Sequence, residues 1–165
     1  MLEKLLEKVR SWQTRFSFGS TSAIIANLAL IVGLDTENNA KVNIIIGILI
    51  IALANNLSES FGLHLIYQQS ENVAPREILL STFFNFLAGI FVSFTFILLL
   101  LILPLNMAVI SSLIWGLGLL TVISYMAIRN RTAKPYLGVM VNLFIAVIVI
   151  FISNMVGDFL IAKMR

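Results

Sequence analysis

Five long apolar runs, separated by short polar connections, constrain this sequence more than any other feature. They cover residues 17–34, 43–67, 79–103, 106–128 and 136–162. The hydrocarbon core of a bilayer is about 30 Å thick, so a crossing helix needs about 20 mostly apolar residues. Backbone groups cannot stay unpaired in lipid, and these runs are too long and non-alternating for barrel strands. The sequence therefore predicts an all-α integral membrane protein with five transmembrane helices.

Composition agrees with this fold class, because the chain is 59% hydrophobic and only 12% charged. We expect one five-helix transmembrane domain over residues 16–165, preceded by a short amphipathic helix over residues 1–15. In that helix the apolar side chains fall on one side at helical spacing: Leu2, Leu5, Leu6, Val9 and Trp12. Such a helix either lies in the membrane interface or docks on the inner face of the protein itself.

The basic residues of the connections predict the orientation in the membrane. One side would carry Lys4, Lys8, Arg10, Arg15, Arg76, Arg129, Arg131 and Lys134, and the other Lys41, Lys163 and Arg165. Short loops rich in Lys and Arg stay in the cytoplasm, which places the N-terminus inside and the C-terminus outside. Because these charges lie beside predicted crossings, we interpret them as topology signals and expect no nucleic-acid partner.

Small residues spaced four apart predict contacts between the helices. Three pairs occur: Gly89 with Ser93, Ser112 with Gly116, and Ser153 with Gly157. Small residues let two helix backbones approach closely in a membrane, either within one chain or between two chains.

Polar residues gather in the middle of the apolar runs, above all in the second. Asn55, Asn56 and Glu59 lie three or four positions apart, so they share one face of a helix, and His64 extends this face toward the cytoplasm. Asn27 lies near the middle of the first run. A polar stripe of this length cannot face lipid, so we expect it to line a wet crevice between helices.

Glu59 is the ionisable group at the centre of this stripe. A charge deep in a bilayer costs on the order of 3 kcal/mol or more, so Glu59 should face the bundle interior, a water-filled cavity or a partner subunit. Carboxylate and amide oxygens suit a hard divalent cation such as Mn²⁺ or Fe²⁺. The alternative is that Glu59 and the asparagines only hold helices together through hydrogen bonds, and that His64 has a structural role.

Catalytic patterns are absent from the sequence. It has no cysteine, no nucleophile beside a base, no phosphate-binding glycine loop and no paired carboxylates. We therefore predict no enzyme and no cofactor, and a cation pathway fits the polar stripe better than an intramembrane reaction.

Two segments carry a resemblance to a known family. FGSTSAIIANLALIVGL (residues 18–34) and the helix ending SESFGLHLIYQQSE (residues 58–71) resemble the vacuolar iron transporter family. The resemblance implies five-helix protomers that pair as homodimers, with the N-terminus in the cytoplasm, and that export Fe²⁺ or Mn²⁺ in exchange for protons. Family members usually carry Asp in a pattern like FGxxDG, where this chain has Ser22, and plant-type members add a Glu-rich cytoplasmic domain that is missing here.

The polar stripe on the second run and the resemblance to vacuolar iron transporters together give one leading hypothesis for the function. The chain would be a small multi-pass protein of a prokaryotic cell membrane that transports or binds a divalent cation, with proton coupling implied by the family. Glu59 would supply charge, Asn55 and Asn27 midplane oxygen ligands, and His64 with Glu71 the point where the cation enters. The alternative is a membrane scaffold that keeps the fold without transport.

Overall fold

The structure, a computed structural model, describes residues 19–35, 39–69, 75–129 and 134–164, and every regular element in these ranges is an α-helix. A first helix, Gly19–Gly33, is followed by α2 (Ala40–Gln68), α3 (Pro75–Ile102), α4 (Leu105–Ile128) and α5 (Pro135–Met164). The all-helical prediction is confirmed for these residues. The predicted helix over residues 1–15 lies outside them, as does Glu71.

Four of these helices, α2 to α5, are long and apolar enough to cross a membrane. This is compatible with a multi-pass integral membrane protein and agrees with four of the five predicted crossings. The described part of the first helix is apolar but shorter, and the predicted start of its crossing, residue 17, lies outside the described ranges.

Proline and asparagine define several helix starts. Pro75 and Pro135 are the first residues of α3 and α5, and Pro104 precedes α4 with φ −63° and ψ 152°. Proline suits these places because the first N–H groups of a helix have no partner within it. Asn39, before α2, adopts a left-handed φ of 60°, which asparagine tolerates better than most residues.

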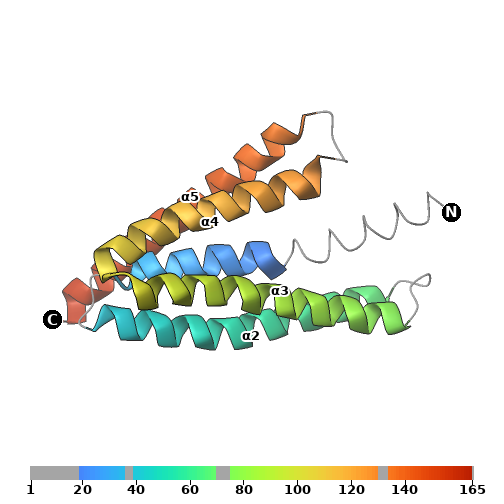
Figure 1. Cartoon of the computed structure of the whole chain (residues 1–165), viewed down its shortest axis with the longest axis horizontal. Helices are drawn as coiled ribbons and strands as arrows, with labels where there is room; N and C mark the ends of the chain where they lie inside the picture. Colours follow the sequence, from blue (N-terminus) through green and yellow to red (C-terminus); the bar gives the residue numbers. More distant parts are fainter. Residues whose placement is uncertain (1–18, 36–38, 70–74, 130–133, 165) are drawn as a thin grey trace.

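The first helix lies between two antiparallel hairpins, α2–α3 and α4–α5 (Figure 1). Successive helices run in opposite directions, so the Gly19 end of the first helix and the last turn of α5 lie at opposite ends of the bundle. The first helix contacts all four others. Its contacts are Ser22 with Glu59 of α2, Asn27 with Ser93 of α3, Leu28 with Gly116 of α4, and Gly33 with Gly157 of α5.

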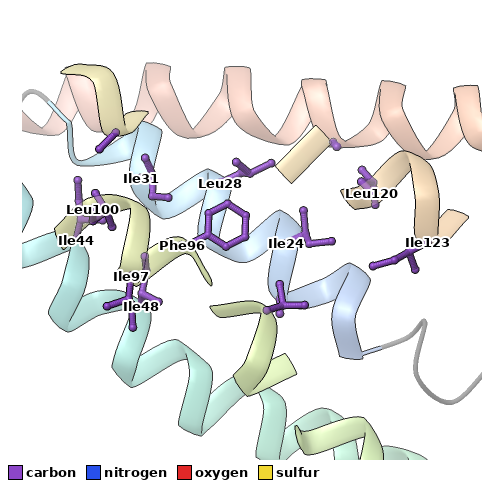
Figure 2. Close-up of a cluster of buried hydrophobic side chains, with 14 of the residues drawn as sticks. Ile24, Leu28, Ile31, Ile44, Ile48, Phe96, Ile97, Leu100, Leu120 and Ile123 are labelled. Atoms are coloured by element: carbon purple, nitrogen blue, oxygen red, sulfur yellow. The ribbon is translucent and has the colours of Figure 1, made fainter. Parts of the chain in front are cut away.

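The apolar core surrounds this central helix (Figure 2). Ile24, Leu28 and Ile31 of the first helix are fully buried. They form one cluster with side chains from α2, α3 and α4, among them Ile44, Ile48, Phe96, Leu100 and Leu120. Large apolar side chains also cover the outer faces of the helices, while buried serines and asparagines lie inside. This distribution suits a protein surrounded by lipid, where close packing and polar contacts hold helices together.

All three pairs of small residues lie at contacts within this one chain. Gly157 meets the backbone of Gly33, Gly116 meets Leu28, and Gly89 meets the amide of Asn56. Added side chains at these glycines would overlap their neighbours. Small residues therefore set the closest approaches of α3, α4 and α5 to the rest of the bundle.

Candidate functional site

Glu59 of α2 lies in a closed group of three polar side chains, which we call the Glu59 cluster: Ser22, Asn55 and Glu59. Ser22 Oγ donates a hydrogen bond to Glu59 Oε1 across the gap between the first helix and α2. Asn55 Nδ2 donates to the same oxygen at 2.8 Å and to Ser22 Oγ at 3.3 Å. Asn55 precedes Glu59 by one helical turn, which explains why their side chains meet. The cluster thus joins two helices through one carboxylate oxygen.

The second carboxylate oxygen, Glu59 Oε2, is buried and has no hydrogen-bond partner among the described residues. Every bond that Glu59 makes within the described ranges comes from a neutral donor, either Ser22 or Asn55. An ionised carboxylate at membrane depth needs a counter-charge. The described side chains around Glu59 supply none.

A furrow leads to this cluster from the side of the bundle. It runs over the first helix between α2 and α5 and consists of two adjoining hollows of about 420 Å³ and about 610 Å³ that share Ala26 and Ala29. Ser22 and Asn55 line the smaller hollow, with Val149 of α5 on the opposite side. The larger hollow is lined almost wholly by apolar residues of the first helix, α2 and α5. A ligand in the furrow would therefore meet Ser22 and Asn55 at one end and mainly apolar side chains, with Ser153, at the other.

A second polar group lies on the other side of the first helix, toward α3, and is buried throughout. Asn85 of α3 accepts a bond from Gly19 N at 2.8 Å and donates one to Ser60 Oγ at 3.1 Å, so it links three helices. Asn27 Nδ2 donates to Ser93 Oγ at 3.0 Å. Asn56 is 1% exposed, and neither its oxygen nor its nitrogen has a hydrogen-bond partner among the described residues.

The structure brings together only part of the predicted ligand set. Glu59 and Asn55 share the cluster, but Asn27 turns toward α3 and bonds Ser93 instead. His64 lies nearer the end of α2, where Gln68 Nε2 contacts its Nε2 at 3.0 Å and Thr82 Oγ1 its Nδ1 at 3.5 Å. Within the described ranges, no three His, Asp or Glu side chains lie close enough to share a metal ion.

Ser22 is the cluster member that our predicted ligand set omitted. Its hydroxyl is the only contribution of the first helix to the Glu59 cluster among the described residues. One feature of the sequence could have identified Ser22 as a site residue. It occupies the position where the FGxxDG pattern of vacuolar iron transporters, which the sequence resembles there, has Asp.

Comparison with known proteins adds no further constraint. No protein-family model matches the chain, and no curated protein or solved structure matches it significantly.

Proposed function

We propose that this chain is a membrane transporter, similar to vacuolar iron transporters, that binds a divalent cation such as Fe²⁺ or Mn²⁺ at the Glu59 cluster. The supporting observation is the carboxylate of Glu59, which Ser22 and Asn55 hold beside a furrow. Among the described residues it has no positive neighbour, and its buried second oxygen has no hydrogen-bond partner. In this proposal the first helix is the fifth crossing, the N-terminus is cytoplasmic and the protein works as a homodimer in a prokaryotic cell membrane.

The ligand chemistry of the cluster favours a hard cation. Glu59 offers a carboxylate, Asn55 an amide and Ser22 a hydroxyl, and oxygen donors of this kind suit Mn²⁺ better than soft metals. Glu59 neutralises only one of the two positive charges, and the remaining ligands would be neutral oxygens or water. Such a site binds weakly, which suits transit, because an ion that moves through a protein must also leave.

Uptake of Mn²⁺ into liposomes that contain the purified protein tests this proposal. We expect uptake with the wild type and loss of at least 90% of it in Glu59→Gln, because glutamine keeps the shape but lacks the charge. Glu77→Gln is the matched control, since Glu77 is exposed in the first turn of α3, and it should leave uptake unchanged. Equal uptake by wild type and Glu59→Gln would refute the assignment.

The scaffold alternative predicts a different result in the same preparation. A scaffold would give no uptake with any variant, and Mn²⁺ would not raise the melting temperature of the purified wild-type protein. Transport predicts that Mn²⁺ stabilises the wild type and Glu77→Gln but not Glu59→Gln, because a bound ligand stabilises the folded state.

A further inference from the structure

The furrow has the size of a site for a small organic molecule. Its two hollows, about 420 Å³ and about 610 Å³, each fall within the range of about 300–1,000 Å³ that is usual for such sites. Ala26, Ala29 and Gly33 form part of its lining along the first helix, and their small side chains leave the space between α2 and α5 open. The furrow is therefore a continuous groove built by three helices.

Its chemistry changes along its length. Toward Gly157 the lining is mostly apolar, with Ile152, Val156 and Leu160 of α5 and one polar residue, Ser153. At the other end the hollow is lined by Ser22 and Asn55, the two residues that hold Glu59. A molecule that matched the whole furrow would combine an apolar body with one polar, positively charged end.

No cationic side chain of the described residues provides this charge. Every described hydrogen bond of Glu59 comes from Ser22 or Asn55, and its Oε2 has no partner in the described ranges. Lys163 is the nearest cation along α5, but it follows Val149 by 14 positions, a distance of about 21 Å along a helix at about 1.5 Å per residue. Glu59 does not itself line the furrow, but its carboxylate lies directly behind Ser22 and Asn55, and no positive side chain among the described residues offsets its charge there.

We propose that the furrow binds a lipophilic organic cation, with the charged group at the Glu59 cluster and the apolar body between the first helix, α2 and α5. A lipid acyl chain would fill the apolar part but leave the carboxylate uncompensated. A second copy of α5 would bring apolar surface and Asp158, and its Lys163 lies in the last turn of the helix, far from the level of Glu59. The inference goes beyond metal transport, although it uses the same carboxylate.

Tetraphenylphosphonium and tetraphenylborate test the proposal, because they have nearly the same size and shape but opposite charge. Saturable binding of each radiolabelled ion is measured with purified protein in detergent, with protein-free micelles as background. We expect saturable binding of the phosphonium, at least tenfold weaker binding to Glu59→Gln, and no saturable binding of the borate. Glu77→Gln should bind like the wild type.

A second variant tests whether the furrow itself holds the ligand. Ala29 lines both hollows, so Ala29→Phe should fill the furrow and abolish phosphonium binding while leaving Glu59 in place. Melting curves check that this variant folds. If it does not, Val149→Phe makes the same test from α5, where Val149 lines the polar hollow.

Three outcomes would overturn the inference: equal binding of the two ions, unchanged phosphonium binding in Glu59→Gln, or binding unaffected by a filled furrow in a folded variant. A fourth outcome concerns a second copy of the chain as the occupant. Ile152 is exposed and lines the furrow, so Ile152→Cys would crosslink two copies if a second copy covered it. Efficient crosslinking that phosphonium does not reduce would overturn the inference. The two proposals can fail independently. Absence of Mn²⁺ uptake together with Glu59-dependent phosphonium binding would refute only the metal proposal. Glu59-dependent Mn²⁺ uptake without phosphonium binding would refute only the present inference.

Discussion

Asn85 links three helices through the hydrogen bonds of its side chain. Its side chain bonds Gly19 of the first helix and Ser60 of α2 from its place on α3. Hydrogen bonds between membrane helices contribute about 0.6 kcal/mol on average and at most about 1.7 kcal/mol. We therefore expect Asn85→Ala to lower the free energy of unfolding by about 1–3 kcal/mol, because two bonds and a buried side chain are lost.

Asn142→Ala is the matched control for this prediction. Asn142 is partly exposed and donates one bond, to Ser124 Oγ at 3.0 Å. Its loss should cost less than about 1 kcal/mol. Titration of both variants with a denaturing detergent gives their free energies of unfolding. An equal loss of stability in the two variants would contradict the role assigned to Asn85.

Gly89 and Asn56 form a second pair whose effects should depend on each other. A Cβ atom at Gly89 would overlap the amide of Asn56, which is buried and has no hydrogen-bond partner in the described ranges. Gly89→Ala should therefore destabilise the protein by about 1–3 kcal/mol through overpacking. Adding Asn56→Ala should recover most of this loss, because the shorter side chain makes room. Melting of the single and double variants measures the coupling, and additive effects would contradict it.

At the scale of single residues, sequence spacing predicted one part of the site. Asn55 and Glu59 are four positions apart, which fixes them on one face of α2 whatever that helix packs against. Asn27 could not be placed in the same way, because spacing within one helix does not say which neighbour a given face meets. It follows Ser22 by five positions, about 140° around the first helix, so the two side chains face different partners.

Close approach of α5 to the first helix depends on Gly157, which meets the backbone of Gly33. Any added side chain there must push the helices apart. Gly157→Ala should lower the free energy of unfolding by about 1–3 kcal/mol. Gly118→Ala is the control on α4, since an added Cβ there meets nothing within 4 Å, and it should be neutral or stabilising because alanine favours helix. Equal losses in both variants would contradict a specific contact at Gly157.

The positions of the helices followed closely from hydropathy, and the differences have a common cause. The predicted runs began at residues 43 and 79, whereas α2 begins at Ala40 and α3 at Pro75. Hydropathy marks the part of a helix that is apolar enough for lipid, and the hydrogen-bonded helix continues into polar turns beyond it. The furrow could not be predicted, because it depends on how α2 and α5 are placed on the two sides of the first helix.

At the scale of the whole molecule, α5 is the most exposed of the four long helices. Only 11% of its most apolar stretch is buried, compared with 44% for α3. Its outer side chains, among them Phe144, Phe151 and Phe159, therefore need lipid or another protein as a neighbour. The first helix, in contrast, lies inside the bundle, because it packs against all four other helices. Movement of α5 would change the furrow, whereas movement of the first helix would disturb the whole core.

The orientation of the bundle in the membrane is a further property that the charges predict. Gln69 follows α2 at the end of the bundle that also carries Arg76 and Arg129, and Asn106 is the second residue of α4, at the opposite end (Figure 1). Because the chain has no cysteine, Gln69→Cys and Asn106→Cys each create a single thiol at an exposed position. The positive-inside rule predicts that a membrane-impermeant maleimide labels Asn106→Cys in intact spheroplasts and Gln69→Cys only after permeabilisation. The reverse pattern would place the Arg76 end outside and would contradict entry of a cation from the cytoplasm past His64.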